Sequence, residues 1–262
     1  MPKRCLIQRS VDGSIATLTL DHAQKRNALS AQLVAELISA LQALEANHIR
    51  VVILRAAAAS TVWSTGHDIN ELPVDGRDPL GWSDPLRELV RSIEGLRVPV
   101  IAMIEGGVWG GAVEVVLACD IIIASPAATF AVTPAKLGVP YNVSGMMTFM
   151  SAANLRLVKE LAFTAAPISA VRAEQVGMIN HVVPADSLEA FTQKMADTIA
   201  ANAPLSIAVM KEQLRVLAGA KPLSPRGFEE VQGLRRVVYD SQDYQEGIRA
   251  FKEKRKPVFT GQ

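Results

Sequence analysis

The chain has 262 residues, of which 49% are hydrophobic and 20% are charged, a balance typical of a globular protein with a large buried core and not of a disordered one. Its 27 basic and 26 acidic residues give a formal net charge of +1, so the chain has no overall positive field for nucleic acid or for an anionic membrane. We expect neither as a partner, and an anionic ligand must be bound by a local group of residues.

The first part of the chain predicts a β-hairpin followed by a helix and a strand. Leu6–Gln8 and Ile15–Leu20 are apolar, β-branched runs joined through Asp12-Gly13, a strong signal for a tight hairpin turn. Ser30 can cap a helix whose leucines recur at helical spacing, and the β-branched run Val51–Leu54 predicts the strand behind it. The leucines on this stripe are Leu33, Leu37, Leu41 and Leu44.

The middle of the chain repeats this alternation of helix and strand. Asp84-Pro85 supplies an N-cap and a first-turn proline for a helix that precedes the strand Val100–Ile104. Gly106 to Gly111 is predicted as a glycine-rich turn into the helix Ala112–Ala118, with the strand Ile121–Ala124 behind it. Because these strands have no polar alternation, we expect them to be buried on both faces of a sheet.

The last third is predicted to be mainly helical. Ser169 caps a short helix closed by Gly177, Ile179–Val183 gives one more strand, and no convincing strand follows Ser187. We divide the chain at Ala203-Pro204 into a core, residues 1–202, and a helical region, residues 203–262, whose apolar stripes need the body or another subunit as a partner. The helices expected here are Leu188–Ala201, Pro204–Leu217, Pro225–Tyr239 and about Gln242–Lys254.

The cysteines and the charge pattern indicate a cytoplasmic protein. Only Cys5 and Cys119 occur, and Cys119 lies in an apolar run typical of a reduced core thiol. The most apolar region, Val98–Ala124, is interrupted by three acidic residues, which argues against a membrane span. The histidines show no ligand spacing, so no metal site is predicted.

Two glycine-centred turns are the candidate functional elements. Ser64-Thr65-Gly66-His67-Asp68 and Gly106–Gly111 each follow a strand and precede helical sequence. Glycine permits close approach to the backbone, and N–H groups at a helix N-terminus suit an oxyanion. The alternative is that these glycines only allow tight packing between helix and strand. Neither turn matches the phosphate-binding or dinucleotide-binding glycine patterns.

Together these motifs resemble the crotonase, or enoyl-CoA hydratase/isomerase, superfamily. The resemblance includes Lys25-Arg26-Asn27-Ala28-Leu29, Gly66-His67-Asp68-Ile69, Gly110-Gly111 followed by Glu114, and Phe251 with Lys254. It implies an α/β fold, a crotonase-like spiral of ββα units, with a helical C-terminal region for trimerisation into a homotrimer or a dimer of trimers. It also implies an oxyanion hole made by the backbone N–H groups of His67 and Gly111.

The same resemblance implies an acyl-CoA thioester as the substrate. Lysines, an arginine and an aromatic ring suit the phosphates and adenine of CoA. The alternative for Lys25, Arg26 and Lys254 is an ordinary solvated surface charge. The residues implied to bind CoA are Lys25, Arg26, Ala28, Gly66, Ile69, Gly110, Phe251 and Lys254.

The candidate catalytic residues indicate which reaction of this family to expect. Hydratases of this family use two glutamates; the first corresponds to Glu114, but the second position falls on Pro134, which can neither accept nor donate a proton. The segment Leu137-Gly138-Val139-Pro140-Tyr141-Asn142 instead brings a tyrosine to the pocket region. With the other motifs, it resembles the branch of the family that decarboxylates methylmalonyl-CoA.

That branch implies cofactor-independent loss of CO2 from a 2-carboxyacyl-CoA, with the enolate held in the oxyanion hole. Tyr141 would bond the substrate carboxylate, and Glu114 is kept as a fourth candidate catalytic residue beside His67, Gly111 and Tyr141. Neither a metal nor biotin is expected, since CoA arrives as part of the substrate. Two alternatives stay open: a hydratase or isomerase that pairs Glu114 with Glu71 or Asp68, and an inactive CoA-binding homologue.

Overall fold

The strands form two sheets. The structure is a computed structural model that describes residues 5–45, 48–58, 60–73, 78, 80–219 and 224–261. In sheet order, the six-stranded sheet comprises β1 (Ile7–Asp12), β2 (Ile15–Leu20), β3 (Val51–Ala56), β5 (Val100–Ile104), β7 (Ile121–Ala124) and β10 (His181–Val182). The four-stranded sheet comprises β4 (Val62–Ser64), β6 (Gly107–Trp109), β8 (Thr129–Ala131) and β9 (Ile168–Ser169).

Successive pairs of strands each contribute one strand to each of the two sheets. In β3–β4, β5–β6 and β7–β8, the first strand joins the large sheet and the second joins the small one, each parallel to the previous unit. The helices α2 (Pro85–Gly95) and α3 (Gly111–Leu117) follow the first two pairs, and α4 (Val143–Ala152) and α5 (Leu155–Thr164) follow the third. This arrangement is the predicted spiral of ββα units.

The local signals placed most of the longer elements correctly. The hairpin between β1 and β2 turns at Gly13, whose φ of +55° suits glycine. The helix α1 (Ala31–Glu45) begins after Ser30, whose Oγ accepts a hydrogen bond from the Leu33 amide at 3.3 Å. Ser169 likewise caps α6 (Ala170–Gln175). Capping side chains therefore set these helix starts as predicted.

Several short elements differ from the prediction. The expected turn from Gly106 to Gly111 contains β6, and the strand expected at Ile179–Val183 is reduced to β10. The elements β4, β8, α4 and α5 were not predicted from the sequence. Strands of two or three residues show too little periodicity to be read from the sequence, and they form here because neighbouring strands of the same sheet pair with them.

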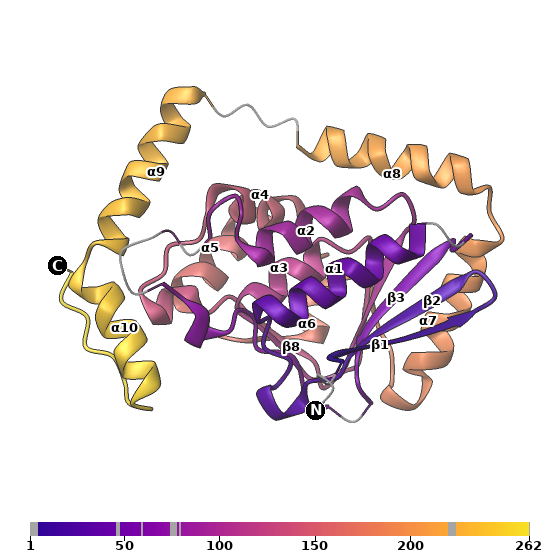
Figure 1. Cartoon of the computed structure of the whole chain (residues 1–262), viewed down its shortest axis with the longest axis horizontal. Helices are drawn as coiled ribbons and strands as arrows, with labels where there is room; N and C mark the ends of the chain where they lie inside the picture. Colours follow the sequence, from indigo (N-terminus) through magenta and orange to yellow (C-terminus); the bar gives the residue numbers. More distant parts are fainter. Residues whose placement is uncertain are drawn as a thin grey trace.

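Apolar side chains cover both faces of the large sheet. Every residue of β5 is buried, as expected for a parallel strand between two layers. On one face, the helix α7 (Ala185–Ala200) buries Leu188 and Ala196 against Val51 and Ile101. The other face belongs to the main core, where α1 and α2 lie side by side (Figure 1).

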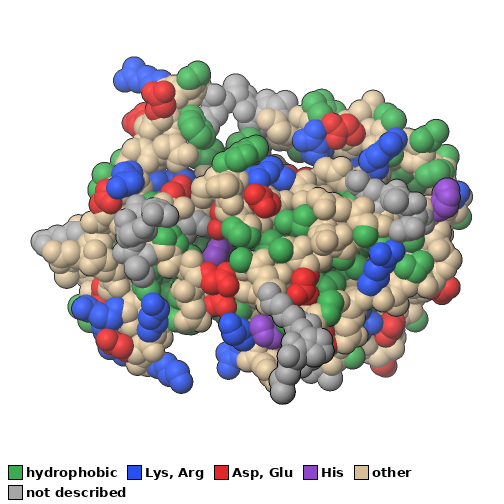
Figure 2. All heavy atoms as spheres, in the orientation of Figure 1, with side chains coloured by type: hydrophobic (Ala, Val, Ile, Leu, Met, Phe, Trp, Pro, Cys, Tyr) green, Lys and Arg blue, Asp and Glu red, His purple; other side chains and the backbone are tan. Residues whose placement is uncertain are grey.

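The last three helices lie at the margins of the molecule. α8 (Pro204–Ala218) runs along the top of the molecule in the view of Figure 1, and α9 (Pro225–Tyr239) and α10 (Gln242–Lys252) lie at its left end. Lys211 attaches α8 to the body, with its Nζ 2.7 Å from Asp120 Oδ2 and 3.0 Å from the Val98 carbonyl oxygen. Hydrophobic side chains are visible on the surface over α8 and α9 (Figure 2). Within the described ranges, no helix is long and apolar enough to span a bilayer.

Candidate active site

The two glycine turns meet in space. Gly66 has a φ of +81°, and a Cβ on it would lie 2.6 Å from the backbone nitrogen of Gly111 and 2.5 Å from the Trp109 carbonyl oxygen. A Cβ on Gly111 would in turn lie 3.7 Å from the backbone nitrogen of His67. The close approach of the two backbones therefore depends on the missing side chain of Gly66.

The backbone N–H groups of His67 and Gly111 are the two candidate donors to an oxyanion. Gly111 is the first residue of α3, where an N–H has no intrahelical acceptor. Neither amide donates a hydrogen bond to any residue that the structure describes. The partial positive charge at the start of α3 adds to the attraction for an anionic oxygen.

Both amides belong to residues that line one narrow pocket of about 60 Å³. Leucine, isoleucine and valine side chains form most of its wall, and among the described lining residues none is acidic. An apolar wall strengthens any hydrogen bond made inside it. The lining residues are Thr65, His67, Ile69, Leu72, Leu80, Leu86, Gly110, Gly111, Thr133, Pro134, Leu137, Val139 and Tyr141.

Tyr141 brings an unused hydroxyl to this pocket. Its oxygen is buried and has no hydrogen-bond partner among the described residues. The ring packs edge-on against Phe149 at 5.1 Å, and the absence of a side chain on Gly145 makes room for it. Burial raises the pKa of Tyr141 above its usual value, so the group stays a neutral O–H donor. A buried hydroxyl without a partner is costly, which suggests that a ligand supplies the acceptor.

Both ring nitrogens of His67 have hydrogen-bond partners within the protein. Its Nε2 lies 3.1 Å from Asp84 Oδ2, and its Nδ1 lies 3.3 Å from the Asp68 carbonyl oxygen. Burial lowers the pKa of His67, but the hydrogen bond and charge of Asp84 outweigh it, so the pKa is raised overall. The backbone N–H of His67 is thus the donor that remains for a ligand in the pocket.

Glu114 is not brought together with the other candidate catalytic residues. It is fully buried on α3, forms an ion pair with Arg87 of α2, and does not line the pocket. The second acid expected of a hydratase is also missing, because Pro134 occupies the pocket wall. Asp68 and Glu71, considered as substitutes, bond Lys25 and the Ala31 amide respectively.

The segment implied to bind CoA lies beside the first turn. The Leu29 amide donates to the Gly66 carbonyl oxygen at 2.8 Å, and the Thr65 amide donates to that of Arg26 at 3.2 Å. Lys25 Nζ lies 3.2 Å from Asp68 Oδ2, with more than half of its side chain exposed. These bonds place Lys25, Arg26 and Ala28 next to Gly66, while Ile69 and Gly110 line the pocket itself.

Phe251 and Lys254 lie apart from that segment. Phe251 is exposed at the end of α10, and the Lys254 amide, at a φ of +55°, donates to its carbonyl oxygen at 3.1 Å. Within the described part of the chain, no hydrogen bond or ion pair connects these two residues to Lys25, Arg26 or Ala28. Their contact with CoA stays a prediction.

Two charged residues next to the pocket, Asp84 and Arg87, were not predicted from the sequence as part of the site. Asp84 was predicted only as a helix cap, and Arg87 was not singled out. Arg87 falls within the apolar stripe formed by Leu86, Leu89 and Val90, and a charge on a buried face is a signal that a partner such as Glu114 is required. The contact between Asp84 and His67 depends on tertiary packing and has no local signal.

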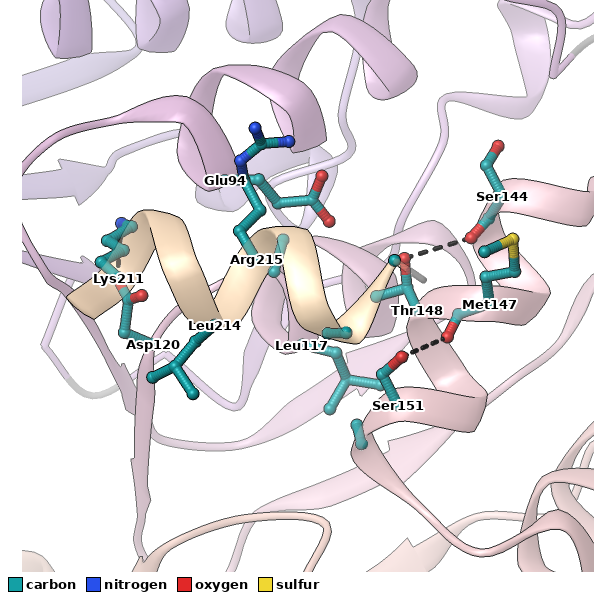
Figure 3. A pocket seen from close by; sticks show the side chains of 14 residues that line it. Glu94, Leu117, Asp120, Ser144, Met147, Thr148, Ser151, Lys211, Leu214 and Arg215 are labelled. Atoms are coloured by element: carbon teal, nitrogen blue, oxygen red, sulfur yellow. Dashed lines mark hydrogen bonds and ion pairs between the residues drawn. The ribbon is translucent and has the colours of Figure 1, made fainter. Parts of the chain in front are cut away.

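A larger cavity of about 430 Å³ lies between α8 and α4. Figure 3 shows Lys211 turned toward Asp120 at one side of this cavity and Glu94 beside Arg215. None of the predicted site residues lines it. Where the structure is described, no group of three His, Cys, Asp or Glu side chains is placed to hold a metal ion.

Comparisons with known proteins show which family the chain resembles over nearly its whole length. The model of the Enoyl-CoA hydratase/isomerase family matches residues 10–262. The chain is 51% identical to methylmalonyl-CoA decarboxylase of Escherichia coli (strain K12) over 247 residues, which are 94% of this chain and 95% of that relative. It is 33% identical to human enoyl-CoA hydratase domain-containing protein 3, covering 96% of this chain and 82% of that relative.

Solved structures give the same result. The chain matches methylmalonyl-CoA decarboxylase in complex with 2-nitronate-propionyl-CoA with a TM-score of 0.97 and 49% identity, covering 98% of this chain and 99% of that one. The same enzyme complexed with 2S-carboxypropyl CoA also gives a TM-score of 0.97, at 48% identity and with complete coverage of both chains.

Proposed function

This chain belongs to the enoyl-CoA hydratase/isomerase family, and on that premise we propose that it is a carboxy-lyase that converts methylmalonyl-CoA to propionyl-CoA and CO2. One observation carries the proposal: an apolar pocket joins two backbone donors to a tyrosine hydroxyl, and among the described residues these three groups have no hydrogen-bond partner and no lining residue is acidic. This arrangement suits an anionic substrate better than it suits a water molecule that must be activated.

The reaction follows from the chemistry of the thioester. The bond between C2 and the carboxylate breaks, CO2 leaves, and the electron pair moves toward the thioester oxygen to form an enolate. The amides of His67 and Gly111 hold this oxygen as its charge grows, each contributing about 3 to 4 kcal/mol. A proton then adds to C2 and completes propionyl-CoA.

Tyr141 orients the carboxylate. Its buried hydroxyl donates to a carboxylate oxygen and turns the group perpendicular to the thioester plane, so that the breaking bond aligns with the carbonyl π system. The leucine-rich wall solvates the carboxylate poorly and thereby favours the neutral product CO2.

No added cofactor is part of the proposal. The thioester is itself the electron sink, so the reaction needs neither biotin nor a metal to stabilise the carbanion. CoA enters with the substrate. We assign Lys25, Arg26 and Ala28, which lie beside the first glycine turn, to contact with its nucleotide, and Phe251 and Lys254 of the C-terminal region to the same part of CoA.

The hydratase alternative has less support. It needs two carboxylates around one water molecule, whereas Glu114 is paired with Arg87 and is not among the residues that line the pocket, and Pro134 stands at the second position. The small pocket volume also suits a short branched acyl group better than a long chain. The intact pair of free amides argues against an inactive homologue.

Residues 203–262 serve assembly in this proposal, and residues 1–202 carry the acyl pocket. We propose a homotrimer or a dimer of trimers in the cytoplasm. Exposed apolar side chains on α8 need a partner, and they include Leu205, Leu214 and Leu217, each about 70% exposed. Light scattering of the pure protein tests the assembly.

Product analysis tests the reaction. The pure protein is incubated with methylmalonyl-CoA, malonyl-CoA and crotonyl-CoA without added cofactor, and the products are identified by mass. The proposal predicts propionyl-CoA from methylmalonyl-CoA at a rate well above any hydration of crotonyl-CoA. Faster hydration would favour the hydratase, and inertness toward all three thioesters would favour the inactive homologue.

A further inference from the structure

The start of α2 contacts His67 and Gly111, the two residues whose amides form the proposed oxyanion hole. Asp84, the cap of α2, bonds the His67 imidazole at 3.1 Å. Leu86, two residues later, lies against Gly111, so that a Cβ on that glycine would be 2.6 Å from Leu86 Cδ2. One helical turn therefore touches both residues whose amides face the substrate.

The two carboxylate oxygens of Asp84 accept hydrogen bonds from different partners. Oδ1 accepts from the Leu86 amide at 2.9 Å and fixes the start of α2, while Oδ2 bonds His67 Nε2. Only 10% of the Asp84 side chain and 17% of the His67 side chain are exposed, so solvent screens this pair little. The contact connects the His67 turn rigidly to the helix.

Both nitrogens of the His67 imidazole form their hydrogen bonds with groups of the protein. When both ring nitrogens carry hydrogen, Nε2 donates to Asp84 and Nδ1 donates to the Asp68 carbonyl oxygen, so the ring spans from α2 to its own turn. Neither ring nitrogen is left to bond the substrate. The hydrogen bonds of the ring therefore fix the position of the His67 backbone.

We propose that Asp84 is a positioning residue of the decarboxylase: by holding the His67 imidazole, it keeps the His67 backbone N–H directed at the thioester oxygen. This inference rests on the proposed function. An oxyanion donor must be correctly placed before the charge develops, and a misplacement of about 1 Å costs roughly 100-fold in rate. Asp84 therefore affects turnover more than binding of CoA.

The charges around His67 favour its protonated form. Asp84 faces it from α2, Glu71 from the short helix Ile69–Glu71, and the Asp68 carboxylate on its own turn is paired with Lys25. On the α3 side, Glu114 is neutralised by Arg87, which also lies near Asp84. Tyr141, across the pocket, stays neutral.

A pH dependence follows with a defined sign. The two-donor form of the ring is lost as the pH rises through the raised pKa of His67, so kcat falls on the alkaline side. Asp84→Asn removes the charge that raises this pKa but keeps an oxygen to cap α2. The alkaline fall should then begin at a lower pH.

A double-mutant cycle tests the inference. Wild type, Asp84→Asn, His67→Asn and the double variant are compared in kcat, KM and pH profile with methylmalonyl-CoA. We expect Asp84→Asn to lower kcat roughly 10- to 100-fold, with KM within about threefold of wild type. In the His67→Asn background, the same change should cost less than about threefold, because its effect passes through the ring.

Asp84→Ser is the companion variant, since serine caps α2 but cannot reach the ring. It should reproduce Asp84→Asn. Any of three results would overturn the inference: an equal loss of kcat in both His67 backgrounds, a raised KM at unchanged kcat, or an unshifted pH profile. The proposed reaction would still be supported by the rate of the wild-type protein. A wild type that decarboxylates no malonyl thioester would overturn the proposed function and the inference with it.

Discussion

The backbone nitrogen of His67 lies 3.7 Å from the point that a Cβ on Gly111 would occupy. Two amides from separate strand-to-helix turns thus lie at one pocket, and neither has a partner among the described residues. Polar groups left unpaired in this way are costly in a folded protein. Binding of a substrate oxygen at this point offsets that cost.

Tyr141→Phe should lower kcat by about 10- to 150-fold, because a hydrogen bond to a charged group contributes about 1.5 to 3 kcal/mol. KM should change little, since the ring and its packing on Phe149 are kept. The melting temperature should stay equal or rise, as the hydroxyl has no partner in the described structure. Steady-state kinetics and thermal melting check both points; unchanged turnover removes the assigned role of Tyr141.

Gly66→Ala should destabilise the protein by about 3 kcal/mol and abolish most activity. The new methyl group would meet the Trp109 carbonyl oxygen and the Gly111 nitrogen and push the two turns apart. Gly177→Ala is the matched control, since Gly177 has a similar φ of +74° with no atom within 4 Å of the added Cβ. It should cost about 1 kcal/mol and keep kcat. Equal effects of both substitutions on kcat would contradict this account.

Glu114→Gln should lower stability by about 3 to 5 kcal/mol, because it removes the carboxylate that forms an ion pair with the buried Arg87 guanidinium. Replacing both residues, as Arg87→Met with Glu114→Met, should recover most of that loss. Chemical denaturation measures the stability, and decarboxylation is assayed on the folded protein. If Glu114 is structural, turnover recovers together with stability in the double variant. A double variant that is stable but inactive would show that Glu114 takes part in the reaction.

Local signals were enough to predict much of the fold. The strands β5 and β7 match their apolar runs residue for residue, and Asp84, Ser169 and Pro225 mark helix starts, because each of these signals acts within a few residues. The three-residue strands β4 and β8 form only because a neighbouring strand is already in place, so the sequence alone did not predict them.

In the site, too, features set by local sequence were predicted and features set by tertiary packing were not. Glycine at positions 66 and 111 predicted close approach of a substrate to the backbone, and Pro134 predicted the absence of a second acid. The pairing of Glu114 with Arg87 and of Asp84 with His67 depends on how α2 packs against α3 and the first turn. Such contacts between distant segments leave little local pattern, although a charged Arg87 on an apolar helix face was one available signal.

Glu246 should hold the C-terminal tail in a way that depends on pH. Its carboxylate accepts hydrogen bonds from Arg255, Arg249 and the Val258 amide, and these bonds, that of Arg255 first, hold its pKa well below the usual range. Their stabilisation is complete above the unfolded pKa near 4.5 and is lost as the pH falls toward the lower folded value.

Glu246→Gln should therefore speed amide exchange at Val258 at pH 7, and the difference from wild type should shrink below about pH 4.5. Hydrogen exchange followed by mass spectrometry measures it. Lys256, which makes no side-chain ion pair in the described structure, offers a control in Lys256→Gln. A Glu246 effect that stays constant from pH 7 to pH 3 would show that the carboxylate charge is not the cause.

The central claim concerns one oxygen atom and two amides. A crystal structure of the protein with propionyl-CoA measures the distances from the thioester oxygen to the backbone nitrogens of His67 and Gly111. The account predicts that both distances lie at about 3 Å. A thioester oxygen that lies beyond hydrogen-bond reach of either nitrogen, with the acyl group still in the pocket lined by Tyr141, would contradict it.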